Sequence, residues 1–207
     1  MIRILLVILT VLVLSSGLIA QNLEKIWNFD GDKTGNIPTG FSNERGEWKI
    51  VTDPTAPSKP NALAQLAKNS GSTFNLTLAK GANYKDLDVS VKMKAIAGQE
   101  DQGGGLVWRA KDANNYYMVR HNPLEDNYRL YKVEQGKRSE IQSADIKSNG
   151  GWHTLRVTMK GDHIQCFYNG QKYLDLQDST FQETGKIGLW TKADAQSHFD
   201  DLKVSGK

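Results

Sequence analysis

Short runs in which apolar and polar residues alternate dominate this chain of 207 residues. The clearest run covers residues 87–95, LDVSVKMKA, in which every second residue is apolar. A period of two is typical of a strand that buries one face. Similar runs recur along the chain between clusters of Gly, Asn, Asp and Pro, and no run has helical periodicity. This pattern predicts an all-β sandwich or barrel with about twelve strands.

Turn residues mark the ends of the expected strands. The expected strands cover residues 26–29, 47–51, 62–66, 72–78 and 87–95, three runs within 103–133, and residues 152–159, 163–168, 171–176, 186–190 and 197–204. Asn169 and Gly170 join two of them and predict a type I′ hairpin, in which both central residues need positive φ. Residues 53–61 hold three prolines and are expected to form a loop. No linker or low-complexity tract divides the chain, so residues 21–207 are expected to form a single domain.

Residues 1–20 have the pattern of a secretory signal peptide. Arg3 precedes an apolar run over residues 4–14, and small neutral residues follow up to Ala20. The run is short for a spanning helix of about 20 residues, so no membrane span is expected after cleavage. We expect a secreted or periplasmic protein. Its one cysteine, Cys166, has no partner for an internal disulfide and is expected to be a buried apolar side chain.

The charge pattern excludes one class of partner. The formal net charge is +3, and basic and acidic residues are interspersed. Nucleic acid is therefore not an expected partner. The sequence gives no indication of the oligomeric state.

Motifs in the second half of the chain resemble a known superfamily. They are residues 151–157 (GWHTLRV), Gly161-Asp162, Asn169-Gly170, residues 185–190 (GKIGLW) and residues 199–202 (FDDL). This series resembles the concanavalin A-like lectin/glucanase superfamily, and within it the bacterial 3-keto-disaccharide hydrolase domains, which are relatives of laminin G-like modules. The resemblance covers nearly all of residues 21–207. It implies an antiparallel jelly-roll sandwich of two sheets, whose concave sheet commonly faces a sugar.

Aromatic and cationic side chains are concentrated in residues 103–133. If residues 111–115 and 122–127 are hairpin loops, cross-strand pairing gives each face of this meander a defined set of side chains. One face carries Leu106, Trp108, Met118, Arg120, Arg129 and Tyr131. The other carries Val107, Arg109, Tyr117, Val119, Leu130 and Lys132. The first set suits sugar binding through flat rings and forked hydrogen-bond donors. A one-residue slip in either loop exchanges the faces, so a core position for Trp108 and Tyr131 stays open.

Further candidates follow from the resemblance. Loops of the resembled fold rim the concave face, which adds Trp190, Lys192 and Asp194 to the expected site. The alternative is that Trp190 caps the core. Asp30 and Asp32 near the first strand, with Asp200 and Asp201 near the last, are either calcium ligands or solvated turn residues.

Two functions of different class remain. Laminarinase-type glucanases of the superfamily carry Glu-x-Asp-x-x-Glu on one strand, and this chain has no such motif. The first hypothesis is therefore a non-catalytic protein that binds glycans, or another extracellular ligand, on the aromatic and arginine face. The alternative is a glycoside hydrolase or lyase that acts on 3-keto-glycosides, whose activated substrate needs only one base. His121, His153 and Asp194 are the weak candidates for that base.

Overall fold

The structure, a computed structural model, describes residues 24–148 and 150–207. The expected signal segment lies outside the described residues. Every regular element in the described part is a β-strand. The strands are β1 (Lys25–Trp27), β2 (Phe41–Arg45), β3 (Trp48–Thr52), β4 (Asn61–Gln65), β5 (Phe74–Tyr84), β6 (Leu87–Ala97), β7 (Gly104–Asp112), β8 (Asn115–Asn122), β9 (Asn127–Glu134), β10 (Lys137–Asp145), β11 (His153–Lys160), β12 (His163–Tyr168), β13 (Gln171–Gln177), β14 (Gly185–Lys192) and β15 (Gln196–Gly206).

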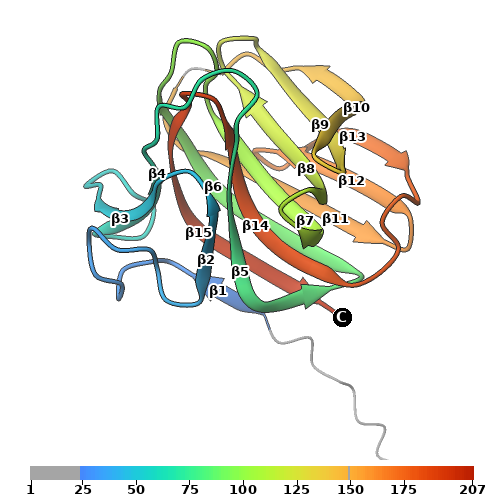
Figure 1. Cartoon of the computed structure of the whole chain (residues 1–207), viewed down its shortest axis with the longest axis horizontal. Coiled ribbons are helices and arrows are strands. Elements are labelled where there is room, and N and C mark those ends of the chain that lie inside the picture. The colour runs from blue at the N-terminus through green and yellow to red at the C-terminus, as the bar shows by residue number, and fades with distance from the viewer. Residues whose placement is uncertain (1–23, 149) are drawn as a thin grey trace, which may run out of the picture.

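The strands form two antiparallel sheets packed face to face (Figure 1). The eight-stranded sheet has the order β13-β12-β11-β6-β15-β4-β3, with β1 paired to β15. The seven-stranded sheet has the order β10-β9-β8-β7-β14-β5-β2 and lies toward the viewer in Figure 1. Strands from both ends of the chain are neighbours, as in β1 with β15 and β14 with β5. The expected all-β jelly-roll sandwich is confirmed.

The main core lies between the sheets and follows the alternation of the sequence. On β6, Leu87, Val89, Val91 and Met93 are buried, while the residues between them are half-buried and face outward. Cys166 is a free, fully buried thiol within the same core, as expected. Burial of such apolar surface is the main stabilising contribution in a fold without disulfides.

The sequence located most strands but missed two of them. The Asn169-Gly170 hairpin between β12 and β13 is present, with both residues at positive φ. The missed strands are β2 and β10, both edge strands of the seven-stranded sheet. Edge strands face solvent on more than one side, so they lack the apolar alternation from which strands were predicted. No helix in the described residues is long and apolar enough to cross a membrane.

Candidate functional site

The pairing of β7 with β8 differs from the expected pairing by one residue. Trp108 pairs with Tyr117, and Val107 pairs with Met118, whereas the sequence placed Trp108 opposite Met118. The register shifts between Trp108 and Asp112, where Arg109 has a φ of 46°. Because of this irregularity, the residues of β7 that precede Arg109 point to the face opposite the expected one.

Trp108 is therefore a core residue and its assignment as a ligand-binding residue is wrong. It is fully buried, packs on Tyr117 at a ring-centroid distance of 5.7 Å, and has its Nε1 3.2 Å from the Met159 sulfur. Leu106 faces the same core. The alternative left open by the sequence holds for these two residues.

The pairing of β8 with β9 agrees with the expected one. Met118 pairs with Tyr131, and Arg120 pairs with Arg129, so these four side chains lie on the face of the sheet that points away from the main core. Trp190 of β14 and Val107 of β7 join them there. Lys192 follows Trp190 on the same face of β14, so the structure brings together six of the seven expected ligand-binding residues and adds Val107.

The outer face of the seven-stranded sheet buries its own side chains. Val107, Tyr116, Met118 and Trp190 are fully buried although they form a cluster separate from the main core. The outward residues of β6 in the other sheet are, by contrast, half-buried and polar. Side chains bury one another in this way where a sheet curves around them. We call this surface the concave face, defined by Phe74, Leu76, Val107, Tyr116, Met118, Arg120, Arg129, Tyr131, Arg138, Trp190 and Lys192.

Arg120 is the most highly connected polar side chain of the concave face. It is 2% exposed, and its Nη1 donates to Asn127 Oδ1 at 2.9 Å. Its Nη2 donates to Glu125 Oε2 at 2.9 Å and to the Tyr131 hydroxyl at 3.4 Å. Its Nε is buried and has no hydrogen-bond partner among the described residues. A buried donor left unpaired is costly, so the other bonds of the Arg120 guanidinium must hold it in this position.

Arg129 and Glu125 extend this network to the surface. Arg129 places Nη1 3.3 Å from Glu125 Oε2 and Nε 3.4 Å from Glu140 Oε2. Burial opposes ionisation of Glu125, but hydrogen bonds from Asn127 and Arg120 outweigh it and lower the pKa of Glu125 to about 2. Glu125 is therefore a carboxylate at any physiological pH.

Arg138 is a site residue that the sequence analysis missed. It projects from β10, and its guanidinium carbon lies 4.4 Å from the centroid of the Tyr131 ring, 5.4 Å from Phe74 and 5.7 Å from Trp190. The missed signal is the turn Gln135-Gly136, where both residues have positive φ. This turn continues the meander by one more strand, and pairing back from it puts Arg138 beside Val133 on the concave face.

Trp190 and Lys192 have different roles in the site. Trp190 is fully buried, donates from Nε1 to the Tyr116 hydroxyl at 3.2 Å and packs against Phe74, so it forms part of the floor. Lys192 places Nζ 3.2 Å from Asp101 Oδ2. Asp101 is 2% exposed and also accepts a hydrogen bond of 2.7 Å from Asn122. Burial raises the pKa of Asp101, against the opposing effects of Arg120 and Lys192.

Two of the three candidate bases meet between the sheets and not on the concave face. Alternation along β8 puts His121 on the opposite side from Arg120, and its ring centroid lies 6.1 Å from that of His153. The two rings line a cavity of about 130 Å³, and the Nε2 atoms of both are buried without a described partner. Burial lowers the pKa of His121 to about 4 and also lowers the pKa of His153. Because the two histidines face the opposite side of the sheet from Arg120, they do not share a site with the residues of the concave face.

Asp194, the third candidate base, holds a loop in place. Its carboxylate accepts hydrogen bonds from the backbone N–H groups of Gln99 at 2.6 Å, Glu100 at 3.0 Å and Asp101 at 3.1 Å. These bonds lower the pKa of Asp194 against the effect of its partial burial. Asp194 thereby positions Asp101 and is not free to act as a base.

Three of the four carboxylates considered for calcium accept hydrogen bonds from other groups. Asp30 accepts from the backbone N–H of Asn61 and Asp32 from that of Thr39. Asp200 is buried and accepts from both the backbone N–H and the hydroxyl of Ser58, and Asp201 is half-buried beside it in β15. Within residues 24–148 and 150–207, no three His, Cys, Asp or Glu side chains are grouped to hold a metal ion. Calcium stays a prediction from the sequence.

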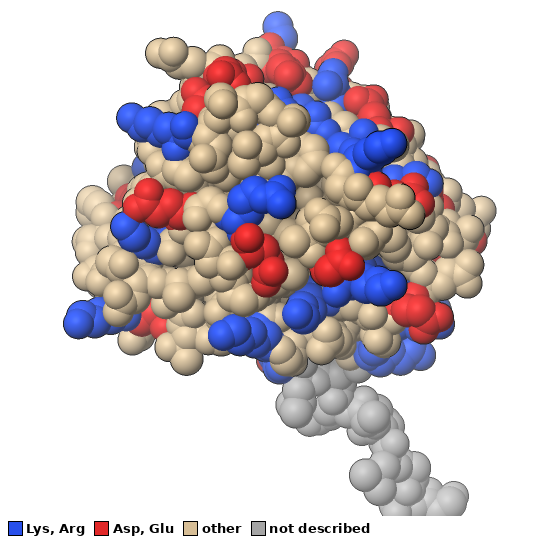
Figure 2. All heavy atoms as spheres, viewed as in Figure 1, with Lys and Arg blue, Asp and Glu red and all other residues tan. Residues whose placement is uncertain are grey.

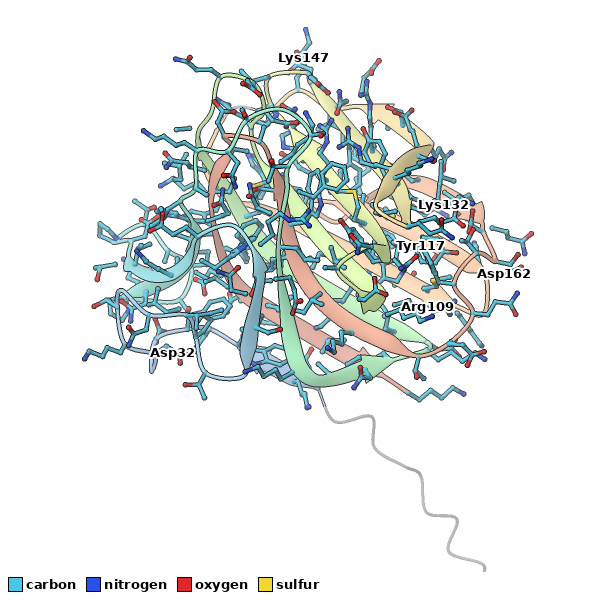
Figure 3. The ribbon with its side chains drawn as sticks, viewed as in Figure 1. Asp32, Arg109, Tyr117, Lys132, Lys147 and Asp162 are labelled. Atoms are coloured by element: carbon cyan, nitrogen blue, oxygen red, sulfur yellow. The ribbon has the colours of Figure 1, made fainter. Side chains whose placement is uncertain are left out.

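A separate depression of about 320 Å³ lies beside Arg109, toward the C-terminal end of β7. Arg109 donates to the backbone carbonyls of Lys85, Phe181 and Gly161 at 2.8, 2.7 and 2.6 Å. In Figure 3, Asp162 lies at the edge of the molecule, and Arg109 and Tyr117 lie nearer its centre. These three bonds, together with an Nη2 to Asp86 Oδ1 distance of 3.7 Å, join Arg109 to three connections between strands, so its role is structural.

Charges of both signs are spread over the molecule. In Figure 2, Lys, Arg, Asp and Glu are interspersed on the face formed by the seven-stranded sheet, with no continuous field of one sign. A long electropositive strip of the kind that binds nucleic acid is absent from this face.

Comparisons with solved structures support the fold. The carbohydrate-binding module CBM66 from Bacillus subtilis is 21% identical, with a TM-score of 0.67 over 80% of this chain and 95% of that one. A Bacillus licheniformis β-glucanase is 13% identical, with a TM-score of 0.58 over 89% and 98% of the two chains. The Crh5 transglycosylase in complex with NAG is 10% identical, with a TM-score of 0.62 over 88% and 83%. At these identities the likeness establishes the jelly-roll fold alone.

The family comparison covers almost the whole described chain. No curated protein matches the sequence at a significant level. A family model described as the 3-keto-alpha-glucoside-1,2-lyase-like domain matches residues 22–205. Together with the sandwich and the motifs of its second half, this match shows that the chain belongs to the 3-keto-alpha-glucoside-1,2-lyase-like (3-keto-disaccharide hydrolase) domain family.

Proposed function

We propose that this protein is a secreted or periplasmic carbohydrate-binding sandwich that holds a glycan on its concave face. The observation that carries the proposal is the convergence of Arg120, Arg129 and Arg138 around Tyr131. Sugars bind to proteins through forked donors that meet hydroxyl pairs and through flat rings that cover C–H faces. The concave face offers both within one surface.

The accessible part of this surface is its rim. Arg129 has 32% of its side chain exposed and Glu125 has 44%, while Arg138 and Phe74 are half-buried. Arg120, Tyr131 and Trp190 lie beneath them and hold them in position. A glycan would meet Phe74, Arg129, Arg138 and Glu125 first, with the donors already oriented by the buried layer. Such preorganisation reduces the entropy lost on binding.

The names of structural relatives agree with this proposal by analogy. Several proteins of the same fold are carbohydrate-binding modules or glycosidases by name. Fold alone does not specify a ligand, so the argument depends on the arginine and aromatic side chains of the concave face.

A glycan array followed by calorimetry tests the proposal. The purified chain is expected to bind one class of glycan, and Arg129→Gln is expected to weaken that binding about tenfold, since a charge-assisted hydrogen bond is removed. Lys137→Gln is the matched control, because it removes the same charge from an exposed position on β10 outside the concave face. A blank array would refute glycan binding and favour a sandwich that only contacts other proteins.

A second candidate function is cleavage of 3-keto-glycosides, the alternative favoured by the family name. The observation behind it is a pair of carboxyl groups with oppositely shifted pKa values near Arg120, since burial raises the pKa of Asp101 while hydrogen bonds lower that of Glu125. Carboxyl pairs shifted apart in this way often divide the roles of acid and base.

The catalytic candidate has its own test. Release of a 3-keto sugar from 3-keto-trehalose or 3-keto-glucosides, lost in Asp101→Asn and kept in Lys137→Gln, would establish it. If no product forms with or without added divalent metal, the catalytic hypothesis is wrong and the binding hypothesis is unaffected.

A further inference from the structure

The charges of the concave face are not balanced within the face. Its cationic side chains are Arg120, Arg129, Arg138 and Lys192, and the carboxylates paired with them are Asp101, Glu125 and Glu140. Glu125 is shared by Arg120 and Arg129, Glu140 contacts Arg129, and Asp101 contacts Lys192. Among the described residues, no carboxylate forms an ion pair with Arg138.

The side chain of Arg138 also makes no hydrogen bond within the described part of the chain. Its Nη1 is buried and unpartnered, and what holds the guanidinium in place is its contact with the rings of Tyr131, Phe74 and Trp190. Burial lowers the pKa of Arg138, and the like charge of Arg120 acts in the same direction, against the opposing effects of Tyr131 and of the more distant carboxylates Asp101 and Glu125. A guanidinium withdrawn from water without a counter-ion is unfavourable.

Tyr131 links this free cation to the buried network. Its ring lies beneath Arg138, its centroid is 5.8 Å from the Arg120 guanidinium carbon, and its hydroxyl accepts from Arg120. Arg120 in turn has its own unpartnered buried donor, Nε. Two guanidinium groups with unsatisfied N–H groups therefore lie near one ring, in a surface whose buried part is formed by aromatic and aliphatic side chains.

We propose that the glycan bound on the concave face carries a carboxylate, as a uronic acid unit does, and that Arg138 receives this carboxylate. The inference rests on the proposed binding function and specifies its ligand. A planar carboxylate matches the fork of a guanidinium through two parallel hydrogen bonds. The sugar ring that bears it would rest beside Phe74, whose ring already lies next to Arg138.

The test compares acidic oligosaccharides with the same oligosaccharides after methyl esterification. Esterification removes the charge of each carboxylate and keeps the sugar and its linkages. The probes are oligogalacturonate, alginate oligosaccharides and glucuronate-containing oligosaccharides, measured by calorimetry on the full chain. At least one free acid is expected to bind at least about tenfold more tightly than its ester. This difference in affinity is expected to decrease as the salt concentration is raised.

Variants of β10 then assign the effect to Arg138. Arg138→Gln is expected to remove the preference for the acid over the ester, and Lys137→Gln is expected to keep it. Arg138→Lys retains the charge without the fork and is expected to give an intermediate preference. Thermal unfolding of each variant checks that the fold is kept.

The outcomes separate this inference from the function on which it rests. If neutral and esterified glycans bind as tightly as the acids, or if Arg138→Gln weakens both forms equally, the carboxylate assignment is wrong and glycan binding stands. A preference for sulfated over carboxylated glycans also overturns the assignment. If no glycan of any kind binds, the proposed function itself is wrong.

Discussion

Protonation of His121 is expected to make this protein less stable as the pH falls below neutrality. His121 is 1% exposed, and burial is the main cause that lowers its pKa from 6.5 to about 4. The unfolded chain takes up a proton near pH 6.5, whereas the folded chain does so only near pH 4. Between these values the unfolded state binds more protons, so the free energy of unfolding decreases as the pH decreases.

The magnitude follows from the shift in pKa. The contribution of neutral His121 to the free energy of unfolding totals about 3 kcal/mol. It is fully present above pH 6.5 and is lost by pH 4. About 2 kcal/mol of this is lost between pH 7.5 and pH 5. The pKa of His153 is lowered in the same direction, so it adds to the effect. The lowered pKa of Glu125 contributes only below about pH 4.5, outside this interval.

Urea unfolding followed by tryptophan fluorescence at pH 7.5 and pH 5 measures this loss. His121→Phe replaces the imidazole with an apolar ring that does not titrate, so the loss between the two pH values is expected to shrink by about 2 kcal/mol. Its stability at pH 7.5 can differ from wild type without affecting the test, since only the change with pH is compared.

His163→Gln is the control, because His163 is exposed on β12 and its replacement leaves the buried pair intact. It is expected to lose at least as much stability between pH 7.5 and pH 5 as the wild type. Equal losses in the wild type and in His121→Phe would refute the assignment of this pH dependence to His121.

Three further outcomes follow from the same structure. Trp108→Ala is expected to destabilise the fold by about 3–5 kcal/mol in urea unfolding, because it removes a large side chain from the core. Trp108→Phe keeps an aromatic ring at this position and is expected to bind glycan with unchanged affinity. A loss of affinity in a folded Trp108→Phe variant would show that Trp108 belongs to the binding site. Arg109→Met leaves the three backbone carbonyls without the donor that Arg109 supplies. It is expected to lower the free energy of unfolding by about 3 kcal/mol or more. An unchanged midpoint of urea unfolding would contradict this structural role. EGTA tests the predicted calcium site. A fall in the melting temperature that added calcium reverses is expected if Asp30, Asp32, Asp200 and Asp201 bind the ion, and an unchanged melting temperature would contradict the site.

The concave face shows how far prediction of the site could go. The sequence paired Arg120 with Arg129 and Met118 with Tyr131 correctly, because the loop between β8 and β9 is regular. It placed Trp108 on the wrong face, because the irregularity at Arg109 shifts the register of β7 by one residue. A bulge of this kind depends on what its side chain reaches, and Arg109 reaches backbone carbonyls far away in the sequence.

The histidines illustrate the same limit. The sequence analysis named His121 as a candidate base without assigning it to a face, and alternation along β8 puts it on the face opposite Arg120. The burial that lowers its pKa, and the approach of His153 from β11, depend on how the two sheets pack against each other. Asp194 looked like a free carboxylate in a loop, and only the folded loop shows that three backbone N–H groups occupy it.

The sequence by itself determined that this chain is an all-β sandwich or barrel, because alternation and turn residues act within a few positions of one another. The jelly-roll topology was implied by the resemblance to the concanavalin A-like superfamily. The sequence also determined that the arginines and tyrosine of β8 and β9 share a face. Only the tertiary structure decided that this face curves enough to bury Trp190 and Tyr116, and that β10 brings Arg138 over their rings without a counter-ion. Sheet curvature and the pairing of an edge strand are properties of the assembled sheet, which no local pattern of residues specifies.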